Sequence, residues 1–201
     1  MRFLLLSVAL ALSLAGPLAV HAESADRDKP MNVEADALRY DDLRQVSVFT
    51  GHVVLTKGTI LIRGARLEVR QDPDGYQYGI VTAEPGKRAF YRQKREGLDE
   101  WIEGESEVID YDGKADRVKF IRQAELRRLR GATPADEMAG SLITYENTTD
   151  VFTVDGGAAS PRPGGRVRAV LAPRESASAP ARPTTPPAHL RSAPALPGET
   201  R

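Results

Sequence analysis

Phe49-Thr-Gly-His-Val-Val-Leu-Thr-Lys-Gly-Thr-Ile-Leu-Ile-Arg-Gly-Ala-Arg-Leu-Glu-Val69 is the stretch that decides the fold. It contains short runs of β-branched and aliphatic residues that are typical of strands: Val53–Leu55, Thr59–Ile62 and Ala65–Val69. Gly51 and Gly58 lie beside these runs, and glycine supplies the positive φ that tight turns need. The stretch therefore predicts antiparallel strands joined by tight turns.

A pattern within this stretch recurs along the chain: an apolar residue, then Gly or Ala two positions later, then two alternating apolar residues. The copies are Val33–Tyr40, Ile62–Val69, a poorer copy at Ile102–Ile109, and Met138–Tyr145. Such a repeat indicates a supersecondary unit that buries its apolar face only by stacking on its neighbours. Sandwich, barrel and solenoid folds all fit regularly spaced strands. The small residue early in each unit suggests a bend between two sheets. We therefore predict an all-β, folded-over β-jelly-roll built from repeated hairpins and open at both ends.

Further strands are predicted at Gln45–Phe49, Arg117–Phe120 and Val151–Val154, with turns at glycine and Asp-Gly positions between them. Arg122–Arg130 also fits a helix, but the register of the repeat places it as a strand. At the two open ends, edge strands would expose unpaired backbone groups to which another strand can bind.

The ends of the chain differ from this β-rich region. Residues 1–22 have a positive charge, an apolar run and small residues before Ala22, which predicts a signal peptide cleaved after Ala22 and an exported protein. The family resemblance described below implies that the exported protein is periplasmic. An uncleaved anchor helix is the alternative, but the apolar run is shorter than the ~20 residues that span a bilayer. Residues 23–173 form the predicted domain. Residues 174–201 are rich in Pro and Ala and predict a disordered tail.

Composition excludes several classes of protein. The chain has no cysteine, so disulfides, thiol catalysis and thiolate metal sites are excluded. Its 28 basic and 28 acidic residues leave no excess of positive charge of the kind that binds nucleic acid. We expect no nucleic-acid partner.

The search for catalytic and metal sites finds only weak candidates. The carboxylates that could form a glycosidase pair lie where a solvated strand or turn would place them: Asp36, Asp41, Asp42, Glu103, Glu105 and Glu107. Asp110–Asp116 faintly resembles a calcium loop but lacks the spacing of an EF-hand. The arginines at 122, 127, 128 and 130 could contact phosphates, or form a solvated face. We expect neither an enzyme, nor a metal site, nor a cofactor.

The ordered set of motifs resembles the OstA-like family. The stretch from Phe49 to Val69 resembles that family's Phe-Thr-Gly-x-Val...Gly-Thr signature, and further landmarks follow in order: Pro30–Glu34, Pro85–Tyr91, Ile102–Gly104, Asp110–Tyr111, Gly140–Tyr145 and Arg166–Pro173. The resemblance covers about residues 30–173. It departs at Ile121-Arg122, where the family has a second Thr-Gly. It also departs at Ala132–Pro134, where we expect this chain to have a longer loop than the family.

The resemblance implies a twisted β-jelly-roll whose interior holds the acyl chains of lipopolysaccharide. It also implies end-to-end assembly that bridges an LptC-like inner-membrane component and an LptD-like outer-membrane component. The implied assembly edges are Met31, Asn32, Val33 and Glu34 at one end and Arg166, Val167, Arg168, Ala169, Val170 and Leu171 at the other.

Alternation along the strands, together with the resemblance, gives candidates for the lipid-binding interior. They are Met31, Val33, Val48, Val53, Leu55, Ile62, Leu67, Val69, Phe90, Tyr111, Val118, Phe120, Ile143 and Tyr145, with Phe152 and Val154. For each residue the alternative is that it only packs the core, because a protein interior is mostly filled by its own side chains.

Three functions are weighed. The resemblance favours a lipopolysaccharide-binding bridge. A carbohydrate- or polymer-binding β-module of the cell envelope is the alternative, and it requires exposed aromatic residues in a groove. An envelope enzyme is the third, and it requires a facing carboxylate pair.

Overall fold

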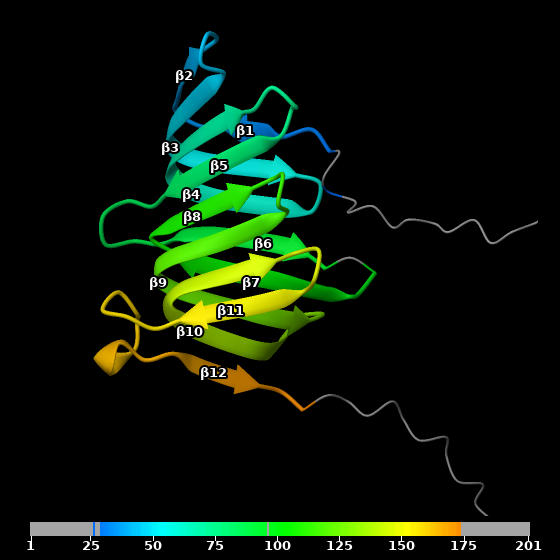
Figure 1. Ribbon diagram of the computed structural model, residues 1–201, viewed down its shortest axis with the longest axis vertical. Coiled ribbons are helices and arrows are strands. Elements are labelled where there is room, and N and C mark those ends of the chain that lie inside the picture. The colour runs from blue at the N-terminus through cyan, green and yellow to red at the C-terminus, as the bar shows by residue number, and fades with distance from the viewer. Residues whose placement is uncertain (1–25, 27–28, 96, 174–201) are drawn as a thin grey trace, which may run out of the picture. The chain divides into compact units, whose positions relative to one another are not determined.

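A computed structural model describes residues 26, 29–95 and 97–173, and its strands belong to one compact unit that ends at Leu171. The strands stack along the long axis of this unit, from β2 at the N-terminal end to β12 at the C-terminal end (Figure 1). They are β1 (Asn32–Glu34), β2 (Ala37–Asp41), β3 (Val46–Lys57), β4 (Ile60–Gln71), β5 (Gln77–Thr82), β6 (Ala89–Lys94), β7 (Glu100–Ser106), β8 (Val108–Asp112), β9 (Arg117–Arg130), β10 (Thr133–Glu146), β11 (Val151–Asp155) and β12 (Arg168–Leu171). A 3₁₀ turn, η1 (Pro163–Gly165), precedes β12.

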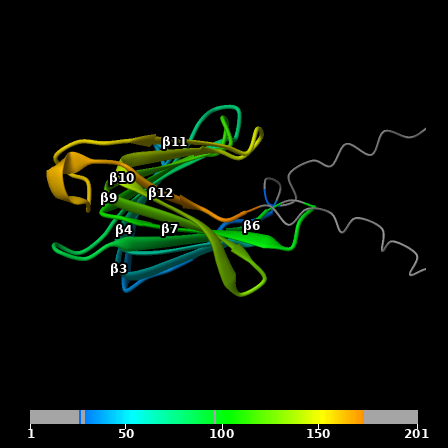
Figure 2. The same cartoon turned by 90° about the horizontal axis from the view of Figure 1, so that it is seen from below.

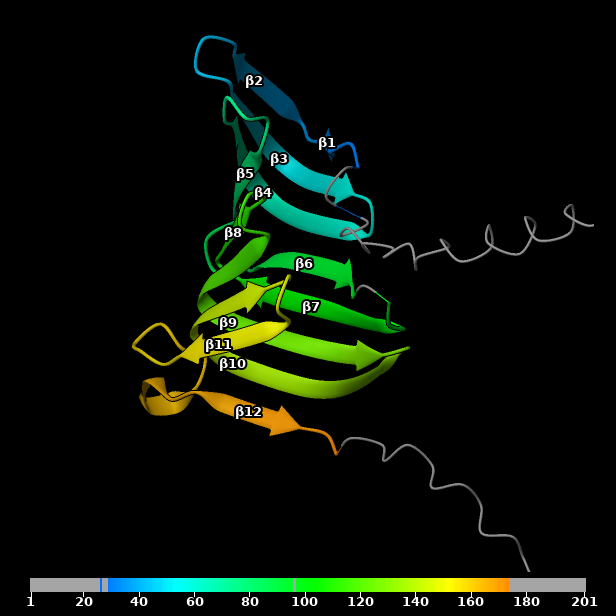
Figure 3. The ribbon, with the colours of Figure 1, turned by 45° about the vertical axis from the view of Figure 1, so that its right-hand side comes forward.

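The strands form two antiparallel layers that face each other (Figure 2). Layer A runs in the order β1, β3, β4, β6, β7, β9, β10, β12, and layer B runs in the order β2, β3, β4, β5, β8, β9, β10, β11. The four long strands β3, β4, β9 and β10 occur in both orders because each bends midway and continues in the other layer (Figure 3). The prediction of an all-β, folded-over jelly-roll is confirmed.

The bends lie along one side of the molecule, which we call the corner. In β3 the bend is at Gly51, where φ is +79°, and the β3–β4 ladder shifts register between Thr50 and Val53. Neighbouring bends are joined by backbone hydrogen bonds; for example, the amide of Glu107 donates to the carbonyl of Arg122 at 3.0 Å. The corner therefore keeps the backbone hydrogen bonded while the sheet folds over.

Arg122 and Gln123 bend β9 with φ values of +61° and +50°. The resemblance leads us to expect a second Thr-Gly at Ile121-Arg122. Instead, the two non-glycine residues Arg122 and Gln123 take the left-handed conformation at this corner. The repeat register is confirmed here, because Arg122–Arg130 lies in β9 and is not a helix.

Large apolar side chains from both layers fill the space between them. Leu67, Tyr91, Ile102, Phe120 and Ile143 are fully buried. Tyr91 meets Phe120 edge-on with ring centroids 5.5 Å apart. Both layers thus contribute to one hydrophobic core.

Some sequence predictions are corrected. The connection at Ala132–Pro134 is short, because β9 ends at Arg130 and β10 begins at Thr133. The last strand begins at Arg168 and not at Arg166, whose carbonyl instead accepts a hydrogen bond from Ser160 Oγ at 2.8 Å.

The predicted signal peptide and the tail at 174–201 lie outside the described residues and stay predictions. Among the residues that are described, no helix has the length and apolar character needed to span a bilayer.

Candidate functional site

The inner face of layer B carries an unbroken row of apolar side chains from one edge strand to the other. Each member is the direct cross-strand partner of the next: Leu38, Phe49, Leu67, Val81, Ile109, Phe120, Ile143 and Val154. Cross-strand partners share a face of a sheet, so the whole row points into the space between the layers.

At the N-terminal end lies a pocket of about 220 Å³, which we call the mouth. Met31 and Val33 line it from the side of layer A, and Tyr40, Phe49 and Val69 line it from layer B. Leu38 lies beside Phe49 on the same face and is 59% exposed. Exposed apolar side chains on an inner face are a surface that favours an apolar ligand.

Behind this mouth the interior is tightly packed. Met31 also lines a second, almost wholly apolar space of only about 10 Å³, together with Leu55, Ile62, Leu67 and Tyr111. Ligand pockets usually have volumes of about 300–1,000 Å³. A long apolar ligand would therefore reach beyond the mouth only if the two layers separated.

Most of the sequence-predicted interior residues do lie between the layers. Val53, Leu55, Ile62, Leu67, Tyr111, Val118, Phe120, Ile143 and Tyr145 are buried in the core, and Met31, Val33, Val69, Phe152 and Val154 pack partly buried against it.

Two of those residues point outward, so their assignment to the interior is wrong. Val48 is the cross-strand partner of Glu68, and both lie on the outer face of layer B. Phe90 alternates with the buried Tyr91 in β6 and lies under the Arg63 guanidinium, whose Cζ is 5.9 Å from the ring centroid. The hydrophobic character of Val48 and Phe90 favoured the wrong face.

Three inner residues at the N-terminal mouth were missed by the sequence analysis: Leu38, Tyr40 and Phe49. The signal was present, because Leu38 and Tyr40 alternate with Arg39 and Asp41 along β2. Phe49 likewise has the same parity as the inner residues Val53 and Leu55 of β3.

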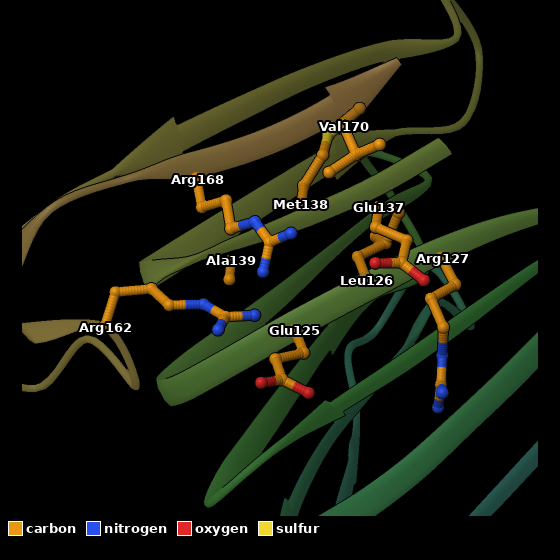
Figure 4. A pocket seen from close by; sticks show the side chains of 9 residues that line it. All are labelled: Glu125, Leu126, Arg127, Glu137, Met138, Ala139, Arg162, Arg168 and Val170. Carbon is orange, nitrogen blue, oxygen red and sulfur yellow. The ribbon is translucent and has the colours of Figure 1, made fainter. Parts of the chain in front are cut away.

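At the C-terminal end the inner face finishes with Phe152, which stacks on Tyr145 with ring centroids 4.5 Å apart. The outer face of layer A carries a separate pocket of about 120 Å³ at this end. Figure 4 shows Arg162 and Arg168 extending over the small side chain of Ala139, with Glu125 and Glu137 nearby.

The predicted assembly edges lie at opposite ends of layer A. Within the described part of the chain, β1 pairs only with β3 and β12 pairs only with β10, so each keeps one free backbone edge. Met31, Arg166 and Val167 precede these strands and are not part of them.

The candidate catalytic and phosphate-binding groups are engaged with other side chains. Among the acids, Asp36 contacts His52, Glu103 pairs with Arg92, Glu105 pairs with Arg88, and Glu107 pairs with Arg122. The arginine cluster is likewise paired, Arg127 with Glu105, Arg128 with Asp136, and Arg130 with Glu100.

In the Asp110–Asp116 segment, an aspartate stabilises an ordinary turn through hydrogen bonds to backbone amides. Asp112 Oδ1 accepts hydrogen bonds from the amides of Lys114 and Ala115 at 3.0 and 2.9 Å. In the region that the structure describes, no group of three or more potential ligands is arranged to hold a metal ion.

Tyr91 and Tyr145 are the two most deeply buried tyrosines of the core. Burial raises the pKa of Tyr91 well above the usual value, and burial together with the nearby Asp150 carboxylate raises the pKa of Tyr145. The Tyr91 hydroxyl donates to Gln93 Oε1 at 2.5 Å, and the Tyr145 hydroxyl donates to Asp150 Oδ1 at 3.1 Å. Both hydroxyl groups therefore stay neutral and hydrogen bonded within the apolar interior.

Comparison with known proteins gives consistent matches. Residues 32–151 match the family described as LptA/(LptD N-terminal domain) LPS transport protein. The lipopolysaccharide export system protein LptH of Pseudomonas aeruginosa is 31% identical over 159 residues, which covers 76% of this chain and 85% of that protein. The lipopolysaccharide export system protein LptA of Escherichia coli K12 is 32% identical over 142 residues, which covers 70% of this chain and 72% of that protein.

A solved structure has the same fold. The crystal structure of Pseudomonas aeruginosa LptH, described as the LptA-homologous periplasmic component of the lipopolysaccharide transport device, superimposes with a TM-score of 0.63 at 26% identity. The superposition covers 74% of this chain and 99% of that chain.

Proposed function

The chain belongs to the LptA/LptD N-terminal-domain family of lipopolysaccharide transport proteins, and we propose on that basis that it binds lipopolysaccharide in the periplasm and passes it from the inner to the outer membrane. The protein acts as a bridge that shields the acyl chains from water. The observation that carries this proposal is the apolar row of layer B, which runs without interruption from Leu38 to Val154.

Shielding is needed because apolar chains do not leave a membrane freely. Each methylene exposed to water costs about 0.8 kcal/mol, so an acyl chain of about twelve carbons costs on the order of 10 kcal/mol. A continuous apolar lining removes most of that cost at every point of the path. The chain itself needs only to offer such a lining, and energy input belongs to other components.

Entry occurs at the N-terminal mouth, where Val33, Leu38 and Phe49 present apolar surface. From there the acyl chains move between the layers as these separate. The fully buried members of the row, such as Leu67 and Phe120, contact lipid only in that separated state.

The partners of the bridge bind at the free edges of the layers. We place an LptC-like inner-membrane component at β1 and either the next copy or an LptD-like outer-membrane component at β12. The free backbone edges of β1 and β12 support this, because an exposed strand edge binds a further strand through main-chain hydrogen bonds. Cleavage after Ala22 would release the protein into the periplasm. The alternative of a carbohydrate-binding module is not favoured, since the curated relatives are export proteins for lipopolysaccharide.

The proposal is tested by mass spectrometry of lipid that co-purifies with the protein from the periplasm of a Gram-negative host. The wild-type chain should carry lipopolysaccharide. Leu38→Asp places a charge on the inner face and should lower the amount about fivefold or more. Arg39→Asp, on the outer face of the same strand, should leave it unchanged. Absence of lipopolysaccharide from the wild type, or equal loss in both variants, would refute the proposal.

A further inference from the structure

The pocket on the outer face of layer A, which we call the outer pocket, lies over β9, β10 and β12 (Figure 4). Its floor is the small side chain of Ala139, whose cross-strand partners are Glu125 of β9 and Arg168 of β12. Arg162 reaches over the same floor from the loop between β11 and β12. The volume of about 120 Å³ holds about four groups of the size of a water molecule. A compact ion fits this space, whereas a nucleotide or a saccharide chain does not.

Arg162 has a buried donor group without an acceptor. Four arginines bury an Nε that has no hydrogen-bond partner in the described part of the protein: Arg92, Arg117, Arg128 and Arg162. The first three still form ion pairs through their terminal nitrogens, whereas Arg162 forms none with any residue that the structure describes. A buried donor without an acceptor costs free energy, so an external acceptor at this guanidinium would stabilise the loop.

Arg168 supplies a second guanidinium of the same kind. Its exposed side chain extends beside that of Arg162 over the pocket (Figure 4). Within the described region, Arg168 likewise has no carboxylate within ion-pair distance. Two neighbouring positive charges repel each other, and an anion between them turns this repulsion into attraction.

The lining of the outer pocket has an excess of positive charge. Glu125 is already paired with Arg88 at 3.0 Å, and Arg127 is already paired with Glu105 at 3.6 Å. The remaining charged groups of the lining are the two unpaired arginines and the exposed carboxylate of Glu137. Their charges sum to one positive charge, which favours an anionic ligand.

The loop holds Arg162 in place before any ligand binds. Arg162 stands between Pro161 and Pro163, and its backbone is extended, with φ −101° and ψ 142°. Proline fixes its own φ and restricts the residue before it, so this segment has little conformational freedom. Ser160 Oγ accepts a hydrogen bond from the Arg162 amide at 3.2 Å and donates one to the Arg166 carbonyl at 2.8 Å. A site organised in this way loses little conformational entropy on binding.

We propose that the outer pocket binds a phosphate group, which the guanidinium groups of Arg162 and Arg168 hold above Ala139. Guanidinium is planar, and its paired N–H donors match the oxygens of a phosphate in charge-assisted hydrogen bonds. A phosphate has enough oxygens to accept from both arginines at once. The ligand is inorganic phosphate or a phosphate monoester. The pocket and the apolar interior lie on opposite faces of layer A, so this site is additional to the proposed path of the acyl chains.

Titration with inorganic phosphate tests the site. The arginine Nε–Hε signals of the full chain are followed by NMR at constant ionic strength, so that general screening of charge does not change. The signals of Arg162 and Arg168 should shift and saturate. Arg162→Gln and Arg168→Gln should each weaken binding about tenfold or more, the effect expected for one lost hydrogen bond to a charged group.

Two further variants separate the pocket from the general charge of the loop. Arg166→Gln removes an exposed arginine that does not line the pocket, and it should leave the phosphate affinity unchanged. Ala139→Leu keeps every arginine but fills the floor of the pocket, and it should abolish binding while circular dichroism shows the same β-sheet content. Equal loss in Arg166→Gln and Arg162→Gln, or undiminished binding in a folded Ala139→Leu protein, would overturn the proposal.

A second arm distinguishes a lipid headgroup from soluble phosphate as the source of the ligand. Lipopolysaccharide and its dephosphorylated form are each loaded onto the wild type and Arg162→Gln. If the phosphate belongs to a headgroup, Arg162→Gln should retain less of the phosphorylated form alone. If it is soluble, both forms should load equally on both proteins while inorganic phosphate still shifts the Arg162 signal.

No response to phosphate in the titration, together with equal loading of both lipids, would overturn the phosphate site. The proposed function would survive that result, because the Leu38→Asp variant tests the apolar interior separately. Conversely, loss of lipid binding in the wild type would leave a saturable shift of the Arg162 signal unexplained by anything except the outer pocket.

Discussion

Arg95 joins the two layers on the side opposite the corner, where its Nη2 lies 3.0 Å from Oδ2 of Asp150. Arg95 directly follows β6 of layer A, and Asp150 precedes β11 of layer B. The arginine also pairs with Glu100, and these carboxylates raise its pKa although burial opposes the shift. This ion pair holds together the side along which the layers must separate if acyl chains are to pass between them.

Removal of this contact should weaken the closed state. For Arg95→Ala we expect a loss of about 1.5–3 kcal/mol in the free energy of unfolding, the usual range for hydrogen bonds to charged groups. The variant should also bind lipopolysaccharide faster in stopped-flow measurements. Arg66→Ala, which breaks the exposed pair with Glu68, should cost less than about 1 kcal/mol and leave the rate unchanged. An unaltered binding rate in a destabilised Arg95→Ala protein would show that layer separation does not limit entry.

A glycine in the middle of layer A limits the packing of the core. A Cβ at Gly104 would overlap the ring of Phe120, so Gly104→Ala should destabilise the fold by about 1–3 kcal/mol in urea unfolding. Phe120→Leu in the same chain should relieve part of that loss.

Gly79 is the matched control, because an added Cβ there would lie at an ordinary 3.6 Å from Leu67 Cδ1. Gly79→Ala should be neutral or stabilise slightly, by up to about 1 kcal/mol. Equal destabilisation at both glycines would mean that strand conformation, and not contact with Phe120, decides the cost.

High pH should unfold the protein through its buried tyrosines. The folded-state pKa values of Tyr91 and Tyr145 are raised, so the folded chain keeps protons that the unfolded chain loses above about pH 10. Stability should be unaffected by these groups below pH 10 and fall above it by about 1.4 kcal/mol per pH unit for each tyrosine. In Tyr91→Phe and in Tyr145→Phe the slope of unfolding free energy against pH should decrease by one such increment. An unchanged slope in both variants would argue against neutral, buried hydroxyl groups.

The sequence predicted that the strands fold into two layers better than it predicted which side chains face the space between them. Gly51 marks the bend of β3, because few other residues accept the left-handed conformation there, whereas the repeated small residues Gly64, Gly104 and Gly140 do not have positive φ. The same rule could not anticipate Arg122 and Gln123, where tertiary hydrogen bonds at the corner hold positive φ without glycine.

The prediction of which side chains face the interior was wrong where hydrophobicity and strand alternation disagree. Phe90 is aromatic, yet Tyr91 occupies the core, where its cross-strand partner is the buried Ile62 and its hydroxyl donates to Gln93. Similarly, Val48 faces outward opposite Glu68 while Phe49 faces inward. Contacts between distant segments, such as Arg95 with Asp150, leave no periodic signal in the chain and became visible only in the folded structure.

The placement of acyl chains between the layers is tested most directly by photo-crosslinking at Phe49 and Val48. These neighbours in β3 are both half-buried but face opposite sides of layer B. A photoreactive residue at position 49 should trap lipopolysaccharide, and the same residue at position 48 should trap almost none. Equal trapping at both positions, or trapping only at position 48, would contradict binding on the inner face.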